Sequence, residues 1–224
     1  MKASNPIADM LQRQKAVNEI VAGNKWFDHE FDWRTAIIVE VGELIDSLDW
    51  KWWKHQSVDL DNAQIECIDI WHFVLSIIAE SAIRQKISND DIEHELEFLL
   101  KVVASGKPEF NSKSAIEHSI QLVSVVTECK SLNFYRAVGA AQKACEISFD
   151  LDMSIEDVAK LYFGKSVLNE FRQRHGYKEG SYKKTWHDRE DNQVMLEFSK
   201  TLQYGPSYEE ELNQLLEDMY LTVE

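Results

Sequence analysis

Residues 36–48, AIIVEVGELIDSL, carry two glutamates three positions apart, Glu40 and Glu43, within a largely apolar run. A second acidic pair, Glu66 and Asp69, has the same spacing in the run IECIDIW. On a helix, positions i and i+3 lie about 60° apart, so each pair shares one face. Four carboxylates drawn toward an apolar seam repel one another and lose hydration unless a cation neutralises them. Because oxygen ligands suit Mg²⁺ and Mn²⁺, this pattern predicts a metal site.

Apolar residues recur at intervals of three and four positions almost throughout the chain, which is the pattern of amphipathic helices. Glycine (8) and proline (3) are scarce among the 224 residues, and no alternating strand pattern of useful length occurs. The fold is therefore predicted to be all-α, a helical bundle. The predicted helices span residues 5–22, 32–48, 61–85, 89–105, 112–130, 133–149, 154–175, 189–202 and 207–221.

Local signals support several of these helix starts. Ser88 precedes Asp91 and Ser154 precedes Asp157, so each serine can cap the free amides of a first turn. No linker or internal repeat interrupts the pattern, so we expect a single domain over residues 1–224.

Composition narrows the class of protein. Hydrophobic residues make up 44%, so the chain is globular, and no apolar run approaches the roughly 18 residues of a membrane span. The first residues lack the hydrophobic segment of a secretory signal, so we expect a cytoplasmic location. A net charge of −15 argues against general nucleic-acid binding. The three cysteines, Cys67, Cys129 and Cys145, have no metal-ligand spacing and are expected to be buried.

Positive charge is concentrated in one window of this acidic chain. Residues 160–190 contain eight Lys or Arg against four Asp or Glu, a net charge of +4. Two segments without helical periodicity are rich in aromatic and cationic residues, residues 49–59 (DWKWWKHQSVD) and 175–188 (HGYKEGSYKKTWHD). Such segments can stack a base and hold phosphates. A solvated helix end and packing tryptophans are the alternative explanations.

Taken in order, these blocks resemble the dimeric dUTPases of the all-α nucleoside triphosphate pyrophosphohydrolase superfamily, which includes phage enzymes acting on dCTP and dUTP. The resemblance rests on Gln14-x-x-x-Asn18, on EVGELIDSLDWKWWK from Glu40, on ECIDIWHF from Glu66, and on the segment from Lys165. It runs from about residue 11 to residue 192. The acidic pairs alone are weak signals, but the four blocks in one order are specific.

The resemblance implies a role for each matching residue. Metal would be bound by Glu40, Glu43, Glu66 and Asp69. Two or three Mg²⁺ ions are expected, for which Mn²⁺ could substitute. The uracil base would be bound by Gln14, Asn18, Trp52 and Phe73. Phosphate and sugar oxygens would be bound by Lys51, Lys54, Lys165, Asn169, Arg172, Tyr177, Lys184 and Asn192. These carboxylates would be the catalytic residues, with Glu43 the expected general base.

The expected reaction is hydrolysis of dUTP, and possibly of dUDP, by a homodimer. Residues 1–85 and 155–205 would form the catalytic part, and residues 86–150 the packing and dimer part. Two alternatives stay open: a sibling pyrophosphohydrolase acting on dCTP or a modified nucleotide, and a helical interaction protein, such as a repressor-binding partner if the chain is phage-encoded. Ser47 and His72 are expected to have structural roles. The pair His187-Asp188 superficially matches an HD phosphohydrolase but lacks that signature's other histidines.

Overall fold

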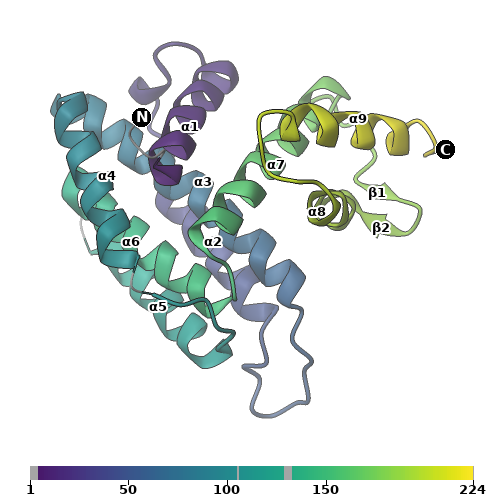
Figure 1. The fold of residues 1–224 in the computed structure, drawn as a ribbon, viewed down its shortest axis with the longest axis horizontal. Helices are drawn as coiled ribbons and strands as arrows, with labels where there is room; N and C mark the ends of the chain where they lie inside the picture. Colours follow the sequence, from purple (N-terminus) through teal and green to yellow (C-terminus); the bar gives the residue numbers. More distant parts are fainter. Residues whose placement is uncertain (1–4, 105, 129–132, 224) are drawn as a thin grey trace. The chain divides into compact units, whose positions relative to one another are not determined.

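The computed structural model describes residues 5–104, 106–128 and 133–223. Contacts divide the chain into two compact units, Met1–Val158 (unit 1) and Ala159–Glu224 (unit 2). Both units are built from helices, and the described residues contain only one small two-stranded sheet (Figure 1). The all-α prediction is therefore confirmed, whereas the single-domain expectation stays a prediction.

Every predicted helix is present in the described part of the chain. The helices and the short 3₁₀ segment of unit 1 are α1 (Pro6–Ala22), η1 (Trp26–Asp28), α2 (Trp33–Asp46), α3 (Leu60–Gln85), α4 (Asn89–Val103), α5 (Ser112–Thr127) and α6 (Phe134–Asp150). Helix α7 (Ile155–Arg174) begins in unit 1 and continues in unit 2, followed by β1 (Thr185–Trp186), β2 (Arg189–Glu190), α8 (Asp191–Thr201) and α9 (Tyr208–Tyr220). Described helix ends differ from the predicted ones by at most two residues, except that α5 ends three residues before its predicted end; such differences are usual at fraying ends. Predicted helix positions 105, 129 and 130 lie outside the described residues.

Side-chain caps explain why these helices start where they do. Ser88 Oγ accepts the backbone N–H of Asp91 at 3.1 Å, and Ser154 Oγ accepts that of Asp157 at 3.1 Å, so both predicted caps are confirmed. Asn5 caps α1 in the same way, accepting from the N–H of Ile7 at 3.0 Å. Each such cap stabilises a helix by about 1 kcal/mol.

Helix α3 is the centre of unit 1. It contacts α1, α2 and α6, and its apolar side chains are buried on nearly all sides, as expected for a helix that is hydrophobic all round. Trp71 is fully buried and donates its indole N–H to Ser148 Oγ at 3.1 Å. This packing holds α1 and α2 beside α3, so residues far apart in sequence meet along one central helix.

The cysteine prediction is confirmed for the described cysteines. Cys67 and Cys145 are both buried and free, and burial raises the pKa of the Cys67 thiol to about 12. They therefore behave as small core residues. Cys129 lies outside the described residues.

Unit 2 has a hydrophobic core of its own. Phe171 of α7, Trp186 of β1 and Tyr208 of α9 are fully buried in it, together with Val194 and Met195 of α8. The hairpin β1–β2 was not predicted, because two-residue strands leave no alternating pattern. The two central residues of its turn are not glycines, yet both adopt the left-handed backbone conformation. The commonest tight hairpin turn requires this conformation at both central positions.

That turn is formed by His187 (φ 47°) and Asp188 (φ 64°), the pair that resembled an HD motif. His187 Nε2 lies 2.9 Å from Thr222 Oγ1. The pair thus has a local structural role.

Among the described helices, none combines the length and apolar character that crossing a bilayer demands.

Candidate metal and nucleotide site

The two acidic pairs meet where α2 packs against α3. Ligand oxygens of Glu40, Glu43 and Glu66 all lie within 4.8 Å of one another. Asp69 is outside this three-residue group but acts electrostatically on Glu40. Glu66 is 7% exposed, whereas Glu43 is exposed to solvent. The cluster therefore has a buried side and an open side.

The electrostatic effects that act on Glu40 in this cluster come from like charges. Burial, which is the largest cause, the negative charges of Asp69, Glu66 and Glu43, and a hydrogen bond with Glu66 together raise the pKa of Glu40 to about 8. At neutral pH without a cation, Glu40 is thus mainly protonated. Oxygen-only donors so close together are the donor set that Mg²⁺ and Mn²⁺ prefer, so the residues present fit the predicted metal.

Helix α3 carries several of the predicted site residues in one stripe. Glu66, Asp69, Phe73 and Ser76 are spaced i, i+3, i+7 and i+10, so they fall within an arc of about 80°. At 1.5 Å per residue, the acidic pair lies about 10 Å along the helix from Phe73 and Ser76. A single helix face thus has carboxylates at one end and aromatic and hydroxyl groups further along.

Gln14 and Asn18, the predicted base readers, lie on α1 where it packs against this helix. They are 5% and 7% exposed, and Gln14 Nε2 donates to Asn18 Oδ1 at 2.9 Å. Asn18 Nδ2 donates to Ser76 Oγ at 3.2 Å, and Gln14 Oε1 lies 2.9 Å from His72 Nδ1. The i, i+4 pairing expected for these two side chains is present, within a four-residue polar network.

The aromatic residues predicted to flank the base have different surroundings. Phe73 is half-buried, with its ring centroid 6.1 Å from that of Trp33 at the start of α2. Trp52 is 89% exposed, and its ring contacts Trp53 edge to face. Because Trp52 packs into no core, packing does not explain its presence in this loop.

Of the cationic residues in the same loop, Lys54 is exposed and Lys51 is half-buried. Lys51 Nζ forms an ion pair with Asp46 and lies 5.5 Å from the centroid of the Trp50 ring. Ser47, at the end of α2, donates to Glu43 O at 3.0 Å and accepts from Asn62 at 2.8 Å, which is a structural role, as expected.

Four of the predicted phosphate and sugar ligands meet in unit 2. Arg172 donates from Nη1 to Asn169 Oδ1 at 3.2 Å and from Nη2 to Asn192 Oδ1 at 3.1 Å. Lys165 Nζ donates to the same Asn192 oxygen at 3.0 Å. Lys165 and Arg172 are 2% and 9% exposed, so these cations belong to a built polar cluster and not to a solvated helix end.

Asp191 organises this cluster and was given no role in the sequence analysis. It is fully buried and accepts Arg172 Nε and Nη2 at 2.8 Å each, a bidentate pair. It also accepts the Tyr182 hydroxyl at 2.7 Å. Burial and the Asp191 carboxylate together raise the pKa of Tyr182 far above its ordinary value. The signal that could have revealed the role of Asp191 is its position directly after the basic window of residues 160–190 and beside Asn192.

The two remaining predicted ligands of unit 2 lie at its surface. Tyr177 is 48% exposed, with the Arg172 guanidinium carbon 5.9 Å from its ring centroid. Lys184 is exposed and lies 3.8 Å from a Glu190 carboxylate oxygen. A weak, exposed pair of this kind contributes little to stability.

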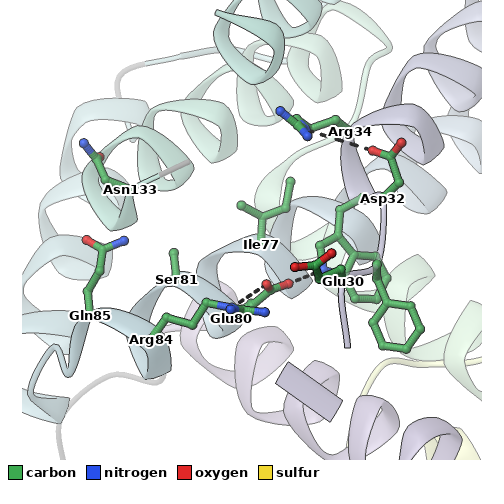
Figure 2. A pocket seen from close by; sticks show the side chains of 11 residues that line it. Glu30, Asp32, Arg34, Ile77, Glu80, Ser81, Arg84, Gln85 and Asn133 are labelled. Carbon is green, nitrogen blue, oxygen red and sulfur yellow. Dashed lines mark hydrogen bonds and ion pairs between the residues drawn. The ribbon is translucent and has the colours of Figure 1, made fainter. Parts of the chain in front are cut away.

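A cavity of about 800 Å³ lies elsewhere in unit 1 (Figure 2). Four of its charged side chains form ion pairs, Arg84 with Glu80 at 2.7 Å and Arg34 with Asp32 at 4.0 Å. None of the residues predicted to bind metal or nucleotide is among the described residues that line it. The cavity therefore offers no alternative site for the predicted chemistry.

Comparison with known proteins gives one family. The sequence model of a family described as dUTPase matches residues 6–177, which is more than half of the chain. No curated protein matches.

Proposed function

This chain belongs to the dUTPase family and is a dUTP-hydrolysing or related nucleotide pyrophosphohydrolase, and within that class we propose that it converts dUTP to dUMP and pyrophosphate. Such a reaction limits the incorporation of uracil into DNA. The observation that carries the proposal is the carboxylate cluster of α2 and α3, in which the charges acting on Glu40 are negative. A cluster of this kind is stabilised by divalent cations, and so is a triphosphate.

We assign metal binding to Glu40, Glu43, Glu66 and Asp69. Mg²⁺ bound there, in two or three copies, would supply Lewis-acid polarisation of the phosphate oxygens. Glu43 takes the proton of the attacking water, because it lies on the exposed side of the cluster. Metal binding there would require the Glu40 carboxyl to lose its proton, since a protonated carboxyl is a poor cation ligand.

We assign the nucleotide contacts to two groups of residues, one that binds the base and one that binds the phosphates and sugar. Gln14 and Asn18 hydrogen-bond the base edge, and Phe73 with Trp52 covers its faces. Positive charge comes from Lys51, Lys54 and Lys184. Donors to phosphate and sugar oxygens come from Lys165, Asn169, Arg172, Tyr177 and Asn192. Positively charged groups stabilise the charge that builds on the phosphates during hydrolysis.

A second candidate is hydrolysis of dCTP or a modified nucleotide on the same machinery. It is favoured by the amide side chains of the base site, since Asn and Gln present donors and acceptors to either pyrimidine. A homodimer, a cytoplasmic location, cleavage of dUDP and a repressor-type partner stay predictions.

The test measures pyrophosphate release from dUTP, dCTP, dTTP and dATP with Mg²⁺, with Mn²⁺ and with excess EDTA. We expect metal-dependent release from dUTP above all others. Calorimetric titration of Mg²⁺ alone into the protein tests the metal site without turnover. Release that persists in EDTA contradicts the metal assignment, and release from dCTP alone establishes the second candidate.

A further inference from the structure

The polar network around Gln14 and Asn18 closes on itself at His72. Ser76 Oγ donates to the backbone carbonyl of His72 at 2.9 Å, one helical turn earlier on α3. The ring of the same histidine contacts Gln14. The described contacts thus run from the His72 ring through Gln14, Asn18 and Ser76 to the His72 main chain. All four side chains are at most 8% exposed.

The direction of these hydrogen bonds is determined by the one group that cannot reverse. A backbone carbonyl only accepts, so the single Ser76 hydroxyl proton points to His72 O at 2.9 Å and not to Asn18 Oδ1 at 3.4 Å. Ser76 Oγ then accepts from Asn18 Nδ2. This contact orients the Asn18 carboxamide with its oxygen toward Gln14 Nε2.

The same logic reaches the histidine. With Gln14 Nε2 donating to Asn18, Gln14 Oε1 faces His72 Nδ1 at 2.9 Å, so Nδ1 carries a proton and donates. The opposite orientation of both amides requires Nδ1 to accept and Ser76 to abandon the His72 carbonyl. The His72 carbonyl still accepts the Ser76 backbone N–H within the helix, but the reversed network makes one hydrogen bond fewer, so the observed polarity is favoured.

We propose that Ser76 and His72 are positioning residues that lock the Asn18 carboxamide in the orientation that reads uracil and rejects cytosine. The proposal rests on the proposed function. Uracil presents a ring N3–H between two carbonyl oxygens, whereas cytosine presents an acceptor N3 beside an amino group. Asn18 Oδ1 can accept the uracil N3–H while the amide nitrogen donates to a carbonyl. Cytosine would set acceptor against acceptor, which a site built for polar groups rejects strongly.

The place of the network on α3 supports this reading. Ser76 shares the helix stripe with Phe73 and the acidic pair, and it lies about 10 Å along the helix from Asp69. That spacing suits a base held apart from its metal-bound phosphates. Ser76 is fully buried, so its effect on a nucleotide passes through Asn18 and not through direct contact.

The test compares kcat/KM for dUTP, dCTP and dTTP in the parent and in Ser76→Ala. We expect the dUTP-to-dCTP ratio to fall roughly tenfold or more, the effect of losing one buried orienting hydrogen bond. The dUTP-to-dTTP ratio should stay within about twofold, because thymine has the same hydrogen-bonding edge as uracil. A general loosening of the site would change both ratios.

Ser81→Ala is the matched control. Ser81 is also a buried serine of α3 and donates to the Ile78 carbonyl at 3.1 Å, but it lies outside the described contacts of Asn18. Its substitution should leave both ratios unchanged. A second route uses the histidine: His72→Leu removes the donor to Gln14 and should lower the dUTP-to-dCTP ratio, whereas His72→Asn places an amide N–H near Nδ1 and should restore most of it.

These outcomes distinguish a failure of the proposed function from a failure of the positioning role of Ser76 and His72. A parent protein that hydrolyses none of the nucleotides refutes the proposed function. A parent that prefers dUTP, together with Ser76→Ala and His72→Leu variants that discriminate equally well, refutes the positioning role alone. A parent that prefers dCTP refutes the deduced polarity while leaving the pyrophosphohydrolase activity intact. Equilibrium binding of dUMP and dCMP to the same variants gives a readout independent of turnover.

Discussion

The acidic cluster of unit 1 and the Arg172 cluster of unit 2 each contain a buried charged residue, yet the charges around these residues differ. Glu66 and Arg172 are similarly inaccessible, 7% and 9% exposed. In unit 2, Arg172 is neutralised within the fold by Asp191, through two hydrogen bonds of 2.8 Å. In unit 1, the charges that act on Glu40 are those of three other carboxylates, and its pKa rises to about 8.

This difference separates a self-sufficient cluster in unit 2 from a cluster in unit 1 for which we propose a metal ligand. A buried cation with a bidentate partner is complete without substrate, so it orders donors in advance. The proposed metal binding would stabilise the clustered acids, so the stability of unit 1 would then depend on the metal. The variants below test whether the two clusters differ in this way.

The largest effect is expected from neutralising an acid in the metal cluster. Glu43→Gln or Asp69→Asn should lower turnover of dUTP by roughly 10²–10⁴, the scale of losing general-base or electrostatic assistance. Glu93→Gln, an exposed acid on α4, is the control and should leave turnover unchanged. Steady-state rates under saturating Mg²⁺ decide the matter, and near-normal turnover in both cluster variants would contradict the site.

The second-largest effect is expected from breaking the Arg172–Asp191 ion pair of unit 2. Asp191→Asn should destabilise unit 2 by about 3–5 kcal/mol, because it leaves the Arg172 charge buried without its partner. Urea unfolding measures the loss. The double variant Arg172→Met with Asp191→Leu should regain most of the stability without regaining dUTP hydrolysis. A double variant as unstable as the single one would show that the pair is not the source of the effect.

Removing a charge from the acidic cluster of unit 1 should have the opposite effect and stabilise the metal-free protein, to a degree that depends on pH. Without metal, the Glu40 pKa is near 8 in the folded state and near its ordinary 4.5 in the unfolded state. Between these values the folded state holds the extra proton, so stability from this group falls as pH rises from 4.5 to 8. Glu40→Gln should therefore stabilise the metal-free protein at pH 8 by about 1–2 kcal/mol, after allowance for solvent screening.

The measurement is urea unfolding in EDTA at pH 5 and pH 8, repeated with Mg²⁺. The gain from Glu40→Gln should shrink at pH 5, where the parent carboxyl is protonated, and should reverse when Mg²⁺ stabilises the parent alone. A gain that is equal at both pH values would exclude Glu40 titration as its cause.

The smallest effect on stability is expected at the exposed loop. Trp52→Ala should change the free energy of unfolding by less than about 0.5 kcal/mol, since the side chain is 89% exposed. It should nevertheless raise the KM for dUTP if Trp52 covers the base. Trp26→Ala, at a fully buried tryptophan of unit 1, is the contrasting variant and should cost about 3–5 kcal/mol. An unchanged KM would remove Trp52 from the base site.

The helices were predictable because their signals are local. Apolar spacing and capping serines such as Ser88 and Ser154 act within a few residues, and the helix positions follow from them. The hairpin turn at His187 and Asp188 was not predictable, because two non-glycine residues with positive φ carry no strong sequence signal. The division into two compact units was likewise not marked, since α7 runs across it without a break.

The sequence by itself determined which residues carry charge and on which helix face they lie, since Glu40 and Glu43 share a face whatever α2 packs against. Only the tertiary structure decided the state of those charges. It placed three carboxylates within 4.8 Å of one another, buried Asp191 against Arg172, and joined Asn18 to Ser76 across 58 positions of the chain. The physical reason is that hydration and Coulomb energies depend on distance and burial, which helix periodicity does not specify.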